Sequence, residues 1–155
     1  MKQKMALLAT LMVVGTLHAP SALSAPESGH DDAQTGIETV IKKYNALVAR
    51  GASAKEVAEL LYEDDLTIIG EGEKSLYPNL ASFMKPLEGY LGNPTCRLAL
   101  VDKIRHSGDV AAAWMLEHCE VHGNSPKEDY RVLYVFRKGT KGWRVTMEMF
   151  GAGTF

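Results

Sequence analysis

The stretch from Thr95 to Val121 constrains the fold more than any other part of the sequence. Two strand-like runs flank a Ser107-Gly108 pair, which is typical of the tight turn of a β-hairpin. A two-residue loop at this pair places Cys96 directly opposite Cys119, on one face of the hairpin. Opposed residues in an antiparallel pair have Cβ atoms about 4.5–5.5 Å apart, close to disulfide geometry. We therefore predict a Cys96–Cys119 disulfide, and the alternative is two buried free cysteines.

The N-terminus indicates export. A short basic start is followed by an apolar run from Met5 to Leu17 and by an Ala-Leu-Ser-Ala sequence that ends at Ala25. This order is typical of a signal peptide, and the apolar run is too short to span a bilayer. We predict that residues 1–25 are a signal peptide, cleaved after Ala25 or after Ser24. The mature protein is then periplasmic or secreted, where disulfides persist, and no later segment is apolar enough to enter a membrane.

The mature chain has the length of one domain. The polar residues 26–35 predict a flexible tail, and residues 36–155 a single domain. Helical periodicity predicts two helices before Tyr62 and a third after Pro78, kinked or divided at Pro86. A short strand follows the second helix, and a four-strand antiparallel meander follows the third. Helices on one side of such a curved sheet make an α+β domain that encloses a cavity.

The alternation of each strand assigns side chains to the two faces of the sheet. In the hairpin, the more apolar set faces the helices. We expect the same face to include Arg131 in the third strand of the meander. Glu117 and Arg131 are then charged residues on an inner face, so they pair, meet a polar ligand or lie at the rim. The opposite face carries Trp114, Tyr134 and Phe150, a mixture that suits a subunit interface. The inward set is Cys96, Leu98, Leu100, Ile104, Ala111, Ala113, Met115, Glu117, Cys119, Val121, Arg131, Leu133, Val135, Trp143, Val145, Met147 and Met149.

Four short motifs occur in the order of a known superfamily. They are Lys43–Leu47, Leu61–Ile68, Ser107–Ala111 and Gly142–Val145. Together they resemble the nuclear-transport-factor-2-like (NTF2-like) superfamily, in its SnoaL-like and ketosteroid-isomerase-like branches. The resemblance implies a cone-shaped α+β fold with an inner pocket, usually as a homodimer through the sheet. It does not imply one function, because this fold hosts isomerases, dehydratases, cyclases and binding modules.

The positions that the isomerase branch uses for catalysis are mostly replaced. Gly70 stands where the resemblance implies the proton-carrying Asp, and Val132 stands near the oxyanion-binding Asp. Only Tyr44 matches, at the oxyanion Tyr position, and it also fits the apolar stripe of the first helix. A donor without a base cannot shuttle a proton, so steroid-type isomerisation is not expected. The His-x-His of several relatives is replaced by Met147-Glu148-Met149, which predicts an apolar wall.

The sequence thus favours a secreted or periplasmic module that binds a small apolar or amphipathic molecule. The first alternative is a SnoaL-like or isomerase-like enzyme (an isomerase, lyase or cyclase) with Glu117 as acid or base and Tyr44 as donor. The second is an interaction domain that uses the outer sheet face. We expect no cofactor and no metal, and the net charge of −2 with scattered basic residues does not favour nucleic acid. The expected ligand-binding residues are Tyr44, Tyr62, Met115, Glu117, Arg131, Met147 and Met149.

Overall fold

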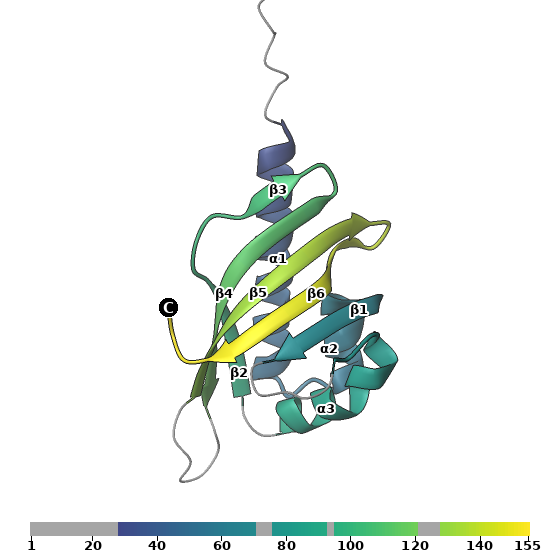
Figure 1. The fold of residues 1–155 in the computed structure, drawn as a ribbon, viewed down its shortest axis with the longest axis vertical. Helices are drawn as coiled ribbons and strands as arrows, with labels where there is room; N and C mark the ends of the chain where they lie inside the picture. The colour runs from purple at the N-terminus through teal and green to yellow at the C-terminus, as the bar shows by residue number, and fades with distance from the viewer. Residues whose placement is uncertain (1–27, 71–75, 93–94, 121–127) are drawn as a thin grey trace, which may run out of the picture.

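The computed structural model describes residues 28–70, 76–92, 95–120 and 128–155. The predicted signal peptide lies outside these ranges. No helix within them is long and apolar enough to cross a membrane. The elements, in chain order, are α1 (Ser28–Ala49), α2 (Ala54–Leu61), β1 (Tyr62–Gly70), α3 (Leu80–Gly92), β2 (Thr95–Leu100), β3 (Arg105–Ser107), β4 (Val110–Glu120), β5 (Glu128–Gly139) and β6 (Gly142–Ala152) (Figure 1).

The helices follow the predicted apolar periodicity, with differences at their ends. The helix α1 begins at Ser28, so it includes most of the segment that we expected to be a flexible tail. A capping box starts α2, because the Ser53 side chain accepts from the Glu56 amide and the Glu56 carboxylate accepts from the Ser53 amide. Pro86 lies inside α3 without dividing it into two helices.

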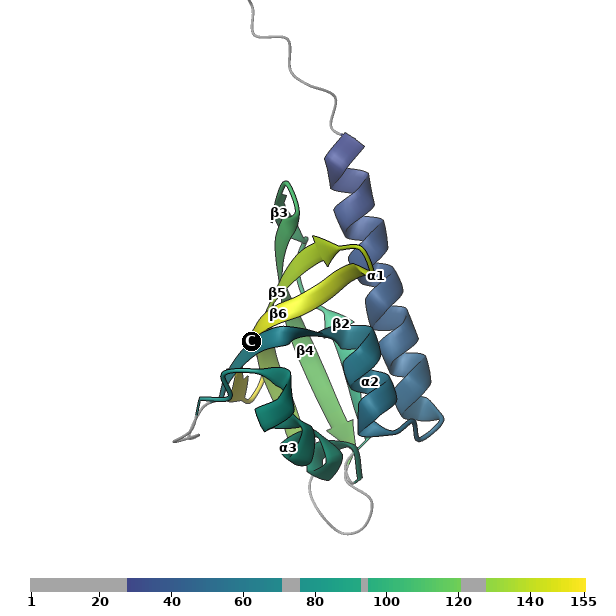
Figure 2. The same ribbon diagram turned by 90° about the vertical axis from the view of Figure 1, so that its right-hand side faces the viewer.

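The sheet has six strands and is mixed. Its order is β1-β6-β5-β4-β2, with β3 also paired to β4. The predicted meander of β4, β5 and β6 is antiparallel, but β1 pairs in parallel with β6. The meander was predicted as antiparallel, and the sheet as a whole is mixed because β1 adds a parallel strand at this edge. Figure 2 shows α1 and α2 on one side of the curved sheet, with α3 near its lower end.

The hairpin turn lies one residue later than we predicted. Ser107 pairs with Val110, so the two loop residues are Gly108 and Asp109. Gly108 has a φ of +56°, which a glycine adopts without strain at the first loop position of a II′ turn. Val101 still donates a backbone hydrogen bond to Trp114 in the register of β2, and the segment 102–104 then leaves the ladder and accommodates the extra residues between β2 and β3. As a result, Cys96 still pairs with Cys119, as predicted.

A β-bulge in β6 reverses which side chains face the helices. Val145 pairs with Phe136 whereas Met147 pairs with Val135, so Thr146 is an extra residue in this strand. Trp143 and Val145 point inward before the bulge, as predicted. After it the inward residues are Glu148 and Phe150, while Met147 and Met149 are 46% and 49% exposed on the outer face.

The inner face of β5 is also the opposite of the predicted one. The buried residues of this strand are Val132, Tyr134 and Phe136, whereas Arg131 is exposed. The pairing of β5 with β4 explains which side chains of β5 face inward. Val132 lies opposite the inward residue Met115, and Tyr134 lies opposite the inward residue Ala113. Both residue sets of β5 contain apolar side chains, so alternation alone did not distinguish them.

Candidate functional site

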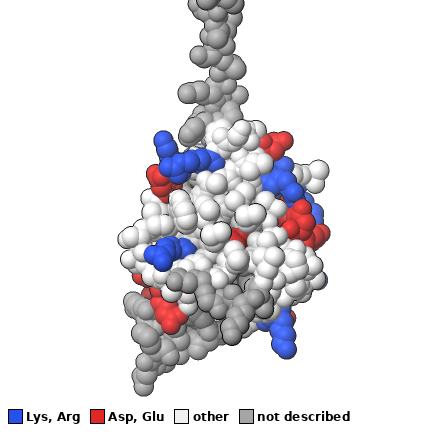
Figure 3. Space-filling model, viewed as in Figure 1, with Lys and Arg blue, Asp and Glu red and all other residues white. Residues whose placement is uncertain are grey.

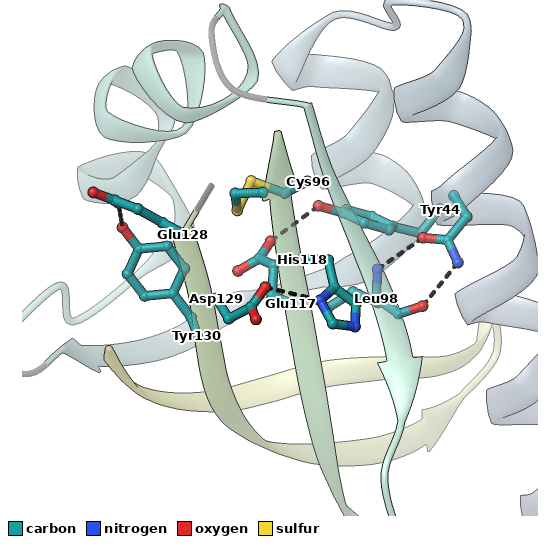
Figure 4. Close-up of a disulfide and its surroundings, with 10 residues drawn as sticks. Tyr44, Cys96, Leu98, Glu117, His118, Glu128, Asp129 and Tyr130 are labelled. Atoms are coloured by element: carbon teal, nitrogen blue, oxygen red, sulfur yellow. Dashed lines mark hydrogen bonds and ion pairs between the residues drawn. A yellow bond between two sulfur atoms is a disulfide. The ribbon is translucent and has the colours of Figure 1, made fainter. Parts of the chain in front are cut away.

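A cavity of about 520 Å³ lies between α3 and the inner face of the sheet. Its walls combine aromatic rings, aliphatic side chains, a disulfide and three carboxylates. Figure 4 shows part of this region, with Glu117 and the disulfide close together on the sheet side. The lining residues are Tyr44, Tyr62, Phe83, Pro86, Leu87, Gly89, Tyr90, Leu91, Cys96, Glu117, Cys119, Glu128, Tyr130, Tyr134, Glu148 and Phe150.

Glu117 lines the cavity from near the C-terminal end of β4. The hydroxyl of Tyr44, from α1, donates a hydrogen bond of 3.3 Å to Glu117 Oε1 (Figure 4). Removal from water raises the pKa of Glu117 to about 7, although the Tyr44 hydrogen bond favours the ionised form. This carboxyl group can therefore exchange a proton near neutral pH.

Glu148 provides a second carboxyl group, which the sequence analysis did not place in the site. It is 5% exposed, and the hydroxyl of Tyr62 donates a hydrogen bond of 2.9 Å to its Oε2. Burial raises the pKa of Glu148 to about 8, and the negative charge of Glu117 adds to this effect. The two carboxyl groups thus form an electrostatically coupled pair.

Three tyrosines surround the pair. Burial is the main cause that raises the pKa of Tyr44, Tyr62 and Tyr134 well above the usual value, and the negative charges of Glu117 and Glu148 add to it. These hydroxyls therefore remain protonated at physiological pH and can act as donors. Tyr134 differs from the other two, because it lines the cavity without a described hydrogen bond to either carboxyl group.

The rim of the cavity carries a third carboxylate. The hydroxyl of Tyr130 donates a hydrogen bond to Glu128 on the same strand (Figure 4). That hydrogen bond is the main cause that raises the pKa of Tyr130 to about 12. Among the described lining residues there is no lysine, arginine or histidine, so the cavity has acidic groups without a basic partner.

The Cys96–Cys119 disulfide forms one wall beside Glu117. The S–S distance is 2.10 Å and the Cα atoms are 4.0 Å apart, so the predicted pairing is confirmed. The two sulfurs and a Glu117 oxygen lie within 4.8 Å of one another. Because both cysteines are oxidised, they are neither nucleophiles nor thiolate ligands in this structure.

The structure brings together only part of the predicted ligand-binding set. Tyr44, Tyr62 and Glu117 line the cavity. Met115 faces the same side of the sheet but is packed in the core. The other three predicted residues face outward: Arg131, Met147 and Met149.

These positions correct two interpretations of the sequence. Glu117 and Arg131 cannot pair inside the cone, because Arg131 lies on the other face of the sheet. The Met147-Glu148-Met149 segment does not form an apolar wall, since its central residue supplies the second carboxyl group. Only knowledge of the bulge at Thr146 would have identified Glu148.

The position implied for the isomerase base is closed by packing. A Cβ atom on Gly70 would lie 2.3 Å from the Phe150 ring, so this site has no room for an Asp side chain in the present arrangement. Val132, near the other implied Asp, is fully buried. The carboxyl groups of this cavity therefore come from β4 and β6 instead.

Comparison with solved structures identifies the fold. A ketosteroid isomerase-like protein from Erwinia carotovora atroseptica is 15% identical, with a TM-score of 0.65 over 81% of this chain and 99% of that one. An NTF2-like protein with a cystatin-like fold from Novosphingobium aromaticivorans is 18% identical, with a TM-score of 0.62 over 79% and 82%. An NTF2-like protein of unknown function from Pseudomonas putida is 18% identical, with a TM-score of 0.61 over 79% and 88%.

No protein-family model matches the sequence, and no curated protein matches it. At these identities the structural matches establish the architecture and leave the chemistry open. The TM-scores of 0.61–0.65 extend over about four fifths of this chain and include its helices and its curved mixed sheet. The chain therefore has the NTF2-like fold.

Proposed function

We propose that the protein binds a small amphipathic molecule in the cavity between α3 and the sheet. The observation that carries the proposal is the pairing of a largely aromatic wall with two desolvated carboxyl groups, Glu117 and Glu148. Ligand sites are typically concave, of about 300–1,000 Å³, and mostly apolar with a few convergent polar groups. The cavity meets each of these criteria.

The polar groups at one end of the cavity would orient the ligand. Burying Glu117 and Glu148 is unfavourable unless their charge or hydrogen-bonding capacity is used. Tyr44 and Tyr62 hold the two carboxyl groups in position by single hydrogen bonds. The aromatic side chains opposite them would then contact the apolar part of the ligand.

Native mass spectrometry of the protein purified from its natural source tests this function. We expect an additional mass of a small molecule that is released on denaturation. The variant Leu91→Trp, which places a larger side chain in the cavity wall, should lose that mass. The variant Leu76→Trp, at an exposed position outside the lining set, should retain it. A wild-type protein that carries no ligand and binds none from an extract of its source would contradict the proposal.

Acid–base catalysis is a second candidate function, favoured by one observation. The pKa values of about 7 for Glu117 and about 8 for Glu148 allow one group to accept and the other to donate a proton near neutral pH. Incubating the identified ligand with the protein tests this activity. Conversion should be lost in Glu148→Gln, while the ligand still binds. An unchanged ligand after prolonged incubation with wild-type protein excludes catalysis on that molecule.

The outer face of the sheet supports a proposal for assembly. The exposed residues Ile69, Trp114 and Met149 contribute to a groove of about 370 Å³ on this face. Figure 3 shows the face as mostly uncharged, with charged side chains mainly near its edges. An exposed apolar face of this kind suits a protein interface, and we propose that two copies of the chain pair through it.

The disulfide supports the proposed location. Cys96 and Cys119 are oxidised, and structural disulfides are typical of oxidising compartments. We propose that the protein acts in the periplasm or outside the cell.

A further inference from the structure

We propose that the ligand of the cavity is an organic cation, a primary ammonium group on an apolar or aromatic body, whose nitrogen lies between Glu117 and Glu148. This inference rests on the proposed binding function and specifies its chemical class. The sequence favoured an apolar or amphipathic molecule oriented in part by Arg131, which lies on the opposite face of the sheet in the structure. Without that arginine, the charged side chains among the described lining residues are all acidic.

The described lining of the cavity has acidic side chains and no basic ones. The carboxyl groups of Glu117, Glu128 and Glu148 line the cavity, and the described lining set contains no basic side chain. A buried carboxylate is stable only when it is paired or well hydrogen-bonded. Since the described lining does not supply a cation here, a bound ammonium group is the complementary partner.

The carboxyl pair offers more hydrogen-bond acceptors than its described neighbours donate to. Two ionised carboxylates offer about four acceptor sites each. The described bonds to this pair are one from Tyr44 to Glu117 and one from Tyr62 to Glu148. An ammonium group brings three N–H donors and a positive charge, so it satisfies further acceptors with charge-assisted hydrogen bonds. A ligand rich in acceptors would leave them unsatisfied.

The Tyr134 hydroxyl adds a polar group that a ligand can use. This side chain lines the cavity and is 2% exposed, and the negative charge of Glu148 raises its pKa after the larger effect of burial. The described bonds to the carboxyl pair come from Tyr44 and Tyr62 and not from Tyr134. A hydroxyl both donates and accepts, so the Tyr134 oxygen can accept a further N–H hydrogen bond from an ammonium group held at the pair.

The remaining walls suit the body of such a ligand. Aromatic rings from α1, α3 and the sheet line the cavity, and the faces of such rings attract cations and pack against apolar groups. The rings of Tyr62 and Phe83 pack edge to face, with their centroids 5.9 Å apart. The Phe83 ring also packs against the rings of Tyr77 and Tyr90. The aromatic members of the lining are Tyr44, Tyr62, Phe83, Tyr90, Tyr130, Tyr134 and Phe150.

Binding of a cation must be linked to proton release. Below the pKa values of about 7 and about 8, Glu117 and Glu148 are protonated and a cation has to displace those protons. Above them the pair is ionised, so affinity should rise with pH and then level off. The other titratable groups facing the pair are Tyr44, Tyr62, Tyr90, Tyr130 and Tyr134, together with Glu128 at the rim.

Three probes of matched size test the inference by isothermal titration calorimetry. Phenethylamine is the cation, phenethyl alcohol the neutral counterpart and hydrocinnamate the anion. At about pH 8.5 an alkylammonium remains charged, as lysine does. We expect phenethylamine to bind roughly ten- to a hundredfold more tightly than the alcohol, the range for charge-assisted hydrogen bonds. Its affinity should fall between about pH 8.5 and about pH 6, with proton release measured from the buffer dependence of the enthalpy.

Variants identify the residues responsible. Glu117→Gln and Glu148→Gln preserve the shape of the side chains and should each lower phenethylamine affinity roughly tenfold, with less proton release. Glu120→Gln, the same change at an exposed position of β4, is the matched control and should bind as the wild type does. The wild-type series needs no variant, so a folding defect in either glutamine variant leaves the test intact.

The outcomes separate the two proposals. Equal or tighter binding of the alcohol or of hydrocinnamate overturns the cation inference and leaves the binding function in place. Absence of binding by all three probes also overturns it. The binding function itself is judged by the co-purified ligand, whose mass and charge state are measured independently.

Discussion

Glu117 and Glu148 influence stability as well as binding, because the folded protein holds their protons more tightly than the unfolded chain does. Their pKa values rise from an ordinary 4.5 to about 7 and about 8. A carboxyl group with a raised folded-state pKa stabilises the native state at low pH. That stability is lost as the pH rises from the unfolded value through the folded one.

We therefore predict that the free energy of unfolding falls between about pH 5 and about pH 8. The slope approaches about 1.4 kcal/mol per pH unit for each proton bound only by the folded state. Glu148→Gln should make this fall shallower, because the amide does not titrate. Urea denaturation at a series of pH values measures the effect, with Glu120→Gln as the control. A variant that matched the wild-type profile would show that Glu148 does not carry the proton.

The Tyr62 hydroxyl, which donates a hydrogen bond to Glu148, is expected to influence the pKa of that carboxyl group. This hydrogen bond lowers the pKa of Glu148, against the larger effect of burial. In Tyr62→Phe the pKa of Glu148 should therefore rise further above its wild-type value. A carboxyl ¹³C titration measures it, and Tyr77→Phe, which removes a hydroxyl with no described bond to either carboxylate, is the control. A fall in the pKa would contradict the hydrogen-bond assignment.

The contact between α1 and β6 depends on a glycine. A Cβ atom on Gly36 would lie 2.4 Å from the Trp143 ring, so the helix must approach the sheet closely there. A Cβ atom on Gly89, in α3, would meet no neighbouring side chain or other element within 4 Å. The two helical glycines thus differ in the space around them.

Alanine substitutions should accordingly have opposite effects. Gly36→Ala is expected to destabilise by about 1–3 kcal/mol through overpacking, partly offset by its better helix propensity. Gly89→Ala should stabilise by about 0.5–1 kcal/mol, because it gains helix propensity without a clash. Chemical denaturation of both variants checks the prediction. A Gly36→Ala protein as stable as Gly89→Ala would mean that α1 and β6 are not packed this closely.

The disulfide between β2 and β4 is expected to stabilise the folded protein. Cys96 and Cys119 are separated by 23 residues, so their bond restricts the unfolded chain by about 3 kcal/mol in the loop-entropy model. The double variant Cys96→Ser, Cys119→Ser should unfold at a correspondingly lower denaturant concentration. A dithiol reductant should have the same effect on the wild type and none on the variant. Identical midpoints with and without reductant in the wild type would argue against the bond.

Prediction from sequence succeeded where a local signal fixed the pairing. The paired cysteines fixed the register of β2 against β4, although the turn lies one residue later than predicted, so Glu117 was correctly placed inside. It failed where the register depends on distant pairing. The extra residue Thr146 reverses the faces of β6, and a bulge leaves no clear signal in a single sequence. Glu148 was missed, and Met147 and Met149 were misplaced, for this one reason.

The two faces of the sheet have different expected roles. The inner face and the helices enclose the cavity, whereas the outer face leaves Trp114 and Met149 exposed. The rings of Trp114 and Phe155 pack edge to face, with their centroids 5.3 Å apart, so Phe155 covers part of this surface. A second copy of the chain would cover the remainder in the proposed assembly.

We predict a dimer in solution that depends on this face. Met149→Glu introduces a charge at a half-exposed apolar position and should shift the protein to a monomer. Ala46→Glu, at an exposed position of α1 on the helical side of the sheet, is the control and should remain a dimer. Analytical ultracentrifugation measures both. A wild type that sediments as a monomer at all accessible concentrations would contradict the proposed assembly.

The pair of desolvated carboxyl groups underlies the proposed binding site, its charge preference and its pH dependence. The most direct test is a ¹³C titration of the glutamate carboxyl groups, with Glu117 and Glu148 assigned by their glutamine variants. The structure predicts midpoints of about 7 and about 8 for these two residues. Midpoints near the ordinary value of 4.5 for both would show that water solvates them freely, and the cavity described here would not be the binding site.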